Sequence, residues 1–383
     1  MKKVLLLFLT LFFLFHLFLL PAVAREEQLI TGEELPEEYL PFLESIPEEV
    51  LELLPKELFS TRSEDVEEAT RRMSSFTFLL KAFLTAVGAE LDGCLGLLAS
   101  ICGLLLLSSL FRTVRSSIGG EGIGRAFSFC ASLSILGILI TKGYESIERV
   151  RAYFSTLNAI TAALLPLLGV LYAMGGNLGA AVASTSGLSV YMTLMEELVG
   201  KSILPFCSVC LAFALVGALD TGLRVGGLLS TVKKNYTTAL AFLMMLLLAM
   251  LSAQTVLSAG HDSLAMRSAK FAAGNLIPVV GGSVSELLRT VSAGVGYLRS
   301  TLGICSILLL LLTLLPTLVQ LLLFRLTWQI GAALADLLGC EAEKKLLEEF
   351  ASLGGYLLAA LAICSSVLVL SLTLLVRCAS AIG

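Results

Sequence analysis

GICSILLLLLTLLPTLVQLLLF, residues 303–324, runs for twenty-two residues without a charged side chain. A helix needs about 20 apolar residues to cross the hydrocarbon core of a bilayer, so this stretch predicts a transmembrane helix. The stretch TTALAFLMMLLLAMLSAQTVL, residues 237–257, has the same character. Over the whole chain 57% of the residues are hydrophobic and 15% are charged, whereas an average soluble domain has about 25% charged residues. The sequence therefore predicts an all-α, polytopic integral membrane protein.

Apolar runs of this kind recur along the chain and predict about seven membrane spans. They lie at 93–111, 126–141, 158–174, 202–220, 237–257, 303–324 and 355–376. The loop 112–125 carries three arginines, which favours a cytoplasmic location for that loop. Seven spans would place the basic stretch 221–235 outside, against the same rule, whereas an eighth pass near 180–199 would bring it inside. Charge alone therefore leaves the topology of residues 175–300 open.

The first residues have the three parts of a secretory signal peptide. Lys2 and Lys3 precede an apolar run over residues 4–20, and Pro21-Ala22-Val23-Ala24 offers a small-residue cleavage site. We therefore expect residues 1–24 to be a signal peptide and the segment that follows to be extracytoplasmic. Cleavage itself stays open, because the apolar run is long enough to act as an anchor.

The acidic segment over residues 25–75 is the one clearly water-soluble stretch. It contains half of the chain's 30 carboxylates, five basic residues and four prolines. Because proline ends helices and about 50 residues bury little core alone, we expect two or three short amphipathic helices rather than a compact domain. Thr61 and Glu64 have the spacing of a capping box, which predicts a longer helix from there toward Leu91. Residues 76–383 are predicted to form the multi-span membrane domain.

The sequence offers little chemistry from which to build an active site. After the signal peptide one histidine remains, His261, without a partner motif for a metal site or a catalytic triad. Cys207-Ser-Val-Cys210 begins an apolar run, where packing is favoured over redox chemistry. The stretch GCEAEKKLLEEF (339–350) predicts a solvated interfacial helix with its leucines and Phe350 near one face. We therefore expect no enzyme activity, catalytic residue, cofactor or metal, and no basic face for nucleic acid.

Two stretches share the pattern of two apolar residues, proline, two apolar residues and glycine. They are ALLPLLGVL (163–171) and NLIPVVGG (275–282), and their similarity suggests an internal duplication. The candidate structural or channel residues are Pro166, Gly169, Gly175, Gly179, Pro278, Gly281 and Gly282. Two readings stay open: re-entrant or Pro-broken helices inside the assembly, or ordinary helix starts kinked by proline at the membrane interface.

The signal peptide, the acidic segment and two specific stretches resemble the stage III sporulation protein AE family. The stretches are TAALLPLLGVLYAMGGNLGAA (161–181) and KFAAGNLIPVVGGSVSEL (270–287). The resemblance implies a membrane subunit, made in the mother cell of endospore-forming bacteria, of a channel or secretion-like complex that late forespore development requires. The implied partners are the other membrane proteins of the same sporulation operon, its ATPase and a forespore-side channel protein.

The resemblance also implies a location, a multi-pass protein in the mother-cell membrane around the forespore, with its N-terminal segment outside the cytoplasm. The alternative is a stand-alone polytopic transporter. A transporter would need coupling charges within its spans, and the predicted spans carry few ionisable side chains. The bilayer is an expected partner in either case, and homo-oligomerisation stays open.

Overall fold

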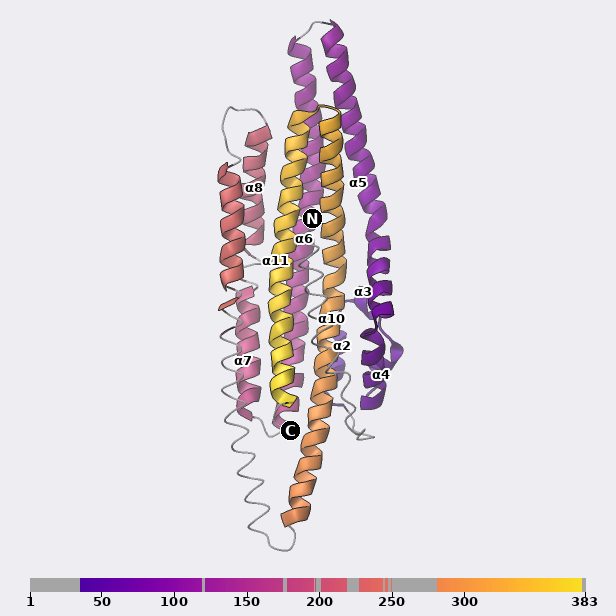
Figure 1. The fold of residues 1–383 in the computed structure, drawn as a ribbon, viewed down its shortest axis with the longest axis vertical. Helices are drawn as coiled ribbons and strands as arrows, with labels where there is room; N and C mark the ends of the chain where they lie inside the picture. Colours follow the sequence, from indigo (N-terminus) through magenta and orange to yellow (C-terminus); the bar gives the residue numbers. More distant parts are fainter. Residues whose placement is uncertain are drawn as a thin grey trace.

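The computed structural model describes residues 35–118, 121–174, 178–195, 197, 201–218, 227–243, 245–246, 249 and 281–380. These residues form helices and turns, with no β-strand among them, and most of the helices run side by side in one elongated bundle (Figure 1). The predicted all-α class is therefore confirmed. The predicted signal peptide lies outside the described residues.

The acidic segment forms four short helical pieces, more than the two or three expected. They are α2 (Tyr39–Glu44), α3 (Glu48–Leu51), the 3-10 helix η1 (Lys56–Phe59) and α4 (Ser63–Met73). We call residues 35–73 the acidic cap. Its apolar side chains are buried in one core with the long helices, and include Tyr39, Phe42, Leu43, Val50, Leu58, Val66 and Met73. The cap is thus stable by packing on the bundle, because it is too short to enclose a core of its own.

The predicted single helix from Thr61 toward Leu91 is wrong. Arg62 precedes α4 without a side-chain cap, and the helix ends at Met73. Ser75 then caps the next helix, because its Oγ accepts a hydrogen bond from the Phe78 N–H at 3.3 Å. A serine that bonds backbone groups in this way stops one helix and starts another.

Helices α5 (Phe76–Ile118) and α6 (Glu121–Met174) form a long hairpin that extends beyond the rest of the bundle at one end (Figure 1). α6 has 54 residues and is therefore about 81 Å long. It contains both predicted spans 126–141 and 158–174, so the expectation of two separate segments is wrong. The charged residues between them stay helical because they form i,i+3 ion pairs, Lys142–Glu145 and Arg151–Glu148.

Helices α10 (Gly281–Leu337) and α11 (Glu341–Ser380) form the central hairpin and pack against each other more extensively than any other described pair. Their turn is a Schellman motif. Gly339 has φ 68°, its N–H bonds Asp336 O at 2.9 Å, and the Cys340 N–H bonds Ala335 O at 2.7 Å. We call this end of the bundle the turn end and the opposite end, where the cap lies, the cap end.

Four helices among the described residues are long and apolar enough to cross a membrane. The segments are Phe76–Leu110, Leu133–Leu171, Thr301–Leu337 and Glu341–Val369. The count of about seven spans stays a prediction, because much of 219–280 lies outside the described residues. The shorter helices α7 (Leu178–Met195), α8 (Ile203–Ala218) and the helix over 227–243 lie on one flank of α11 (Figure 1).

Two apolar cores fill the bundle. The cap-end core joins the cap to the second half of α6 and to the middle parts of α10 and α11, and it also holds Cys207 and Cys210. The packing role predicted for these two cysteines is confirmed. The turn-end core joins α5, the first half of α6, the end of α10 and the start of α11 around the fully buried Trp328.

Candidate functional site at the α10–α11 hairpin

The structure places the predicted proline and glycine residues at several different points. Pro166 and Gly169 lie inside α6, which continues unbroken through the proline, so the re-entrant reading is wrong for this stretch. Pro166 is exposed and Gly169 is half-buried. Gly179 lies near the start of α7.

The second proline stretch is described only in part. Gly281 and Gly282 are the first described residues of α10, and Gly169 lies in α6, which ends at Met174. Pro278 and Gly175 lie outside the described residues. The internal duplication and a channel role for the seven residues therefore both stay predictions.

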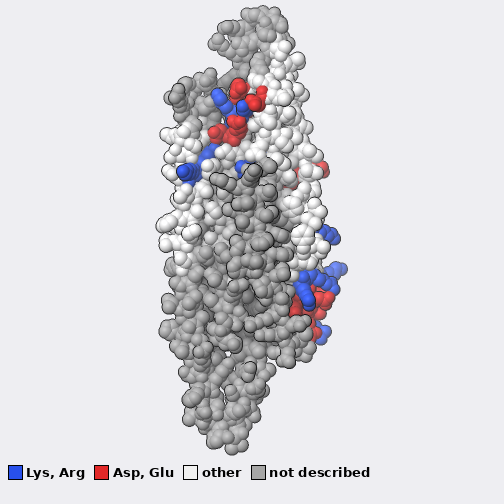
Figure 2. Space-filling view, in the orientation of Figure 1, with Lys and Arg blue, Asp and Glu red and all other residues white. Residues whose placement is uncertain are grey.

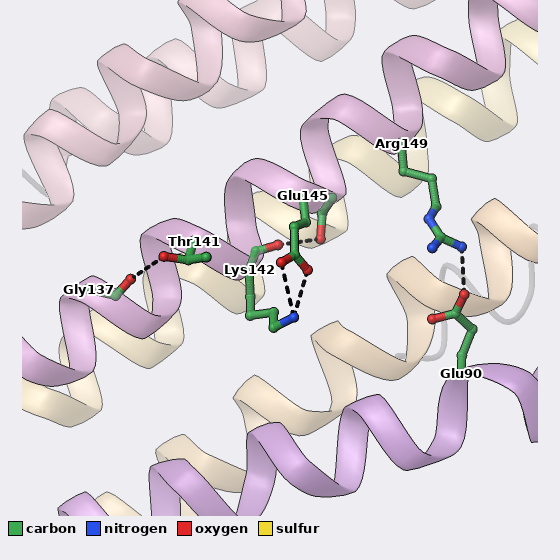
Figure 3. A network of polar contacts seen from close by, with 7 residues as sticks. Glu90, Gly137, Thr141, Lys142, Glu145 and Arg149 are labelled. Atoms are coloured by element: carbon green, nitrogen blue, oxygen red, sulfur yellow. Dashed lines mark hydrogen bonds and ion pairs between the residues drawn. The ribbon is translucent and has the colours of Figure 1, made fainter.

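Charged side chains of neighbouring helices form ion pairs with one another. On α6, Lys142 pairs with Glu145 at 2.8 Å, and Arg149 Nη1 lies 2.6 Å from Glu90 Oε1 on α5 (Figure 3). The Glu90 side chain is 17% exposed, so water screens this pair only partly. The contact fixes the register of the α5–α6 hairpin at this height.

A buried lysine connects the helix over 227–243 to α11. The Lys233 side chain is 3% exposed, and its Nζ lies 2.5 Å from Glu349 Oε2 and 3.1 Å from Ser352 Oγ on α11. The Nζ also lies 6.0 Å from the centre of the Tyr356 ring. A buried charge needs such partners, so this contact anchors the helix to α11.

These ion pairs belong to one layer of the bundle. Phe350, next to Glu349, lies against Gly143, next to Lys142: a Cβ at Gly143 would lie 3.1 Å from the Phe350 ring. We call the layer that holds Glu90, Lys142, Arg149, Lys233 and Glu349 the charged level. Lys233 of the basic stretch 221–235 therefore lies in this layer, whereas the topology of residues 175–300 stays open.

The stretch 339–350 opens α11 with an exposed charged face, and its location at a membrane interface stays a prediction. Its apolar face is buried in the turn-end core, with Leu346, Leu347 and Phe350 at most 2% exposed. Glu343 is also buried, and Ser108 of α5 donates a hydrogen bond to its Oε1 at 3.0 Å. The amphipathic pattern was read correctly, but the apolar face contacts protein.

A groove of about 510 Å³ runs between α10 and α11 toward their turn. Its lining consists of Arg325, Gln329, Ala332, Ala333, Asp336, Lys344, Glu348, Ala351 and Ser352. The small alanine and serine side chains leave the space open. Near the turn, Lys344 Nζ and Asp336 Oδ1 form an ion pair at 2.7 Å. Figure 2 shows charged side chains gathered near this turn and a second group over α4, with mostly uncharged described surface between them.

Arg325 lies at the inner end of the groove, farthest from the turn. Its guanidinium lies against Gly355 of α11, where a Cβ would approach Cζ to 3.0 Å. Nε is buried without a hydrogen-bond partner, and no ion pair joins Arg325 to a residue that the structure describes. An arginine in a membrane helix without a partner is a candidate binding residue.

The sequence pattern does not single out Arg325, because the apolar run 303–324 ends directly before it. The signal that points to it is the adjacent pair Gly354-Gly355 in the following run. In a helical hairpin such a pair leaves room for two large side chains of the partner helix, here Trp328 and Arg325.

Comparisons with known proteins identify the family. The sequence model of stage III sporulation protein AE matches residues 63–379. The stage III sporulation protein AE of Bacillus subtilis (strain 168) is 26% identical over 302 residues, covering 79% of this chain and 73% of the relative. No solved structure matches the chain. The family match begins at the first residue of α4 and includes α5, α6, α10 and almost all of α11, and the chain therefore belongs to the stage III sporulation protein AE family.

Proposed function

We propose that this protein is a membrane subunit of a channel or secretion-like complex that links the mother cell and the forespore and is required for late forespore development. Family membership supports the role in sporulation. One structural observation supports the role as a subunit rather than a stand-alone protein: α5 exposes apolar side chains over a greater length than a bilayer can cover.

The exposed leucines of α5 extend from Leu80 to Leu110, with Leu106 59% and Leu110 61% exposed. Thirty helical residues extend about 45 Å, whereas the hydrocarbon core is about 30 Å thick. Whichever part of α5 lies in lipid, leucines at one end or the other remain outside it. Large exposed apolar surfaces of this kind mark contacts with other proteins.

The partners in this proposal are the other membrane proteins of the same sporulation operon, its ATPase and a forespore-side channel protein. The exposed α5 face at the turn end is the surface offered to another membrane protein. The proposed location is the mother-cell membrane around the forespore, with the acidic cap in the space between the two membranes.

The charge distribution supports this orientation. The cap shares one buried core with Cys305 of α10. Arg325 lies twenty residues further along α10, about 30 Å away. The basic residues of the charged level lie near Arg325, so the positive-inside rule favours that side as cytoplasmic and the cap side as external.

The test is purification of a tagged copy in mild detergent from sporulating cells. We expect the operon's membrane proteins to co-purify in a fixed ratio. The double variant Leu106→Ser/Leu110→Ser should lose them, whereas Leu337→Ser, which alters an 83% exposed leucine at the α10 terminus, should keep them. Recovery of the wild type as a lone monomer or homodimer would contradict the proposal and favour a stand-alone transporter.

A further inference from the structure

We propose that the groove between α10 and α11 is a phospholipid site, in which Arg325 binds the phosphate of the headgroup. This inference goes beyond the proposed function. It needs the hairpin to lie in a membrane, but it does not depend on a role in sporulation.

Arg325 lies at the depth where phospholipid phosphates lie. The charge-free run 303–324 ends directly before it and would span about 33 Å as a helix, close to the thickness of the hydrocarbon core. The matching run in α11, 355–376, begins at Gly355, the residue against the Arg325 guanidinium. Both helices of the hairpin therefore change from apolar to polar at the same height, which is the headgroup region.

Among the residues that the structure describes, no carboxylate pairs with the Arg325 guanidinium. Arg325 is half-buried, its Nε is buried and unbonded, and the ion pairs of the groove lie elsewhere, between Lys344 and Asp336. Desolvating a charge without a partner is unfavourable. Arginine presents several donors in a planar arrangement that matches phosphate oxygens, so a phosphate is a suitable partner.

The rest of the groove fits a headgroup better than a free phosphate ion. Gln329 and Ser352 supply neutral polar groups next to Arg325, whereas Asp336 and Glu348 lie nearer the turn. With Lys344, the groove carries two cations and two anions. A zwitterionic headgroup such as phosphatidylethanolamine would place its phosphate on Arg325 and its ammonium toward the carboxylates.

The experiment uses the full chain, purified in mild detergent and washed free of lipid. The probes are phosphatidylethanolamine, phosphatidylglycerol and inorganic phosphate, and the measurement is the shift of the thermal unfolding midpoint with probe concentration. We expect saturable stabilisation by phosphatidylethanolamine, weaker stabilisation by phosphatidylglycerol and none by inorganic phosphate. Arg325→Gln should weaken the lipid response about tenfold or more, because it removes a charged hydrogen-bond donor.

Two further variants make the result specific. Arg72→Gln removes an exposed arginine of the cap and should leave the lipid response unchanged. Gly355→Ala keeps the arginine but forces its guanidinium to move, so it should also weaken the response. If Arg325→Gln does not fold, the lipid response of Gly355→Ala tests the role of Arg325 instead.

Three outcomes would overturn the proposal. An unchanged lipid response in both groove variants would show that lipid binds elsewhere. Equal stabilisation by inorganic phosphate would make the site one for free anions. Absence of any lipid response in the wild type, together with loss of a co-purifying membrane protein in Arg325→Gln, would assign the groove to an acidic side chain of a protein partner.

Discussion

Single glycines determine how closely α10 and α11 approach each other. At Gly354 an added Cβ would lie 3.0 Å from Cζ3 of Trp328, the largest fully buried side chain. Gly96 of α5 has no atom within 4 Å of the position that its Cβ would take. Close packing therefore requires glycine at position 354 but not at position 96, and the sequence alone does not show this difference.

Gly354→Ala should destabilise the protein by about 1–3 kcal/mol, because the indole ring cannot move in a packed core. Gly96→Ala should leave stability unchanged or raise it by up to about 1 kcal/mol, since alanine favours the helix. Thermal unfolding of both variants in detergent measures this. Equal effects of the two substitutions would mean that α10 and α11 do not pack as closely as described.

The Glu90–Arg149 pair should contribute measurably to the α5–α6 contact. A double-mutant cycle with Glu90→Gln and Arg149→Gln should give a coupling of about 1 kcal/mol, the upper end for partly exposed pairs. The pair Glu68–Arg72 on the cap, with both side chains more than half exposed, is the control and should couple less. Additive effects at Glu90 and Arg149 would exclude a direct interaction between them.

At the scale of single elements, the sequence predicted which stretches are helical better than where each helix ends. The apolar runs 93–111 and 303–324 lie within α5 and α10 and the cap contains short helices, whereas the count of seven spans stays a prediction. The continuity of α6 across Lys142 to Arg151 was missed, because charge was read as a break although no proline or glycine pair interrupts that stretch. Pro166 was read as a helix breaker, yet α6 continues through it.

The sequence also did not reveal where the cap docks on the bundle. Its amphipathic helices showed an apolar face, but not which surface covers it. Tyr39 is 1% exposed and donates a hydrogen bond to Leu58 O at 2.8 Å, and burial raises its pKa above the ordinary 10.0. The neutral phenol is therefore part of the docked state, and its contribution is full below about pH 10 and declines above it, where the unfolded tyrosine ionises.

Tyr39→Ala should loosen the cap and expose Cys305, which is fully buried beneath it. In a variant that keeps only Cys305, N-ethylmaleimide should label this thiol slowly in the wild-type background and several-fold faster with Tyr39→Ala. Tyr39→Phe retains the ring and should label nearly as slowly as wild type. Equal labelling rates in all three would show that the cap does not cover Cys305.

At the scale of the whole molecule, hydropathy predicted a membrane protein but could not separate helices inside the bundle from those on its surface. In the apolar membrane-spanning stretch of α10, 72% of the residues are buried inside the bundle. In that of α5, 28% are buried, although both stretches are strongly apolar. Leucine is equally suited to lipid and to a protein core, so periodicity does not tell the two apart. The arrangement depends instead on sparse residues such as Gly339, Gly354 and Lys233, whose partners lie far along the chain.

The placement of the cap and the α10–α11 turn at opposite ends of the run 303–324 makes a prediction about sidedness. Glu49 in the cap and Lys345 beyond the turn are both exposed. In a background without other cysteines, expressed in the cytoplasmic membrane of vegetative cells, an impermeant maleimide should label Glu49→Cys in intact cells. It should label Lys345→Cys only after permeabilisation. Labelling of both in intact cells would mean that α10 does not cross the membrane between them, and labelling of Lys345→Cys alone would invert the orientation that the basic charged level favours.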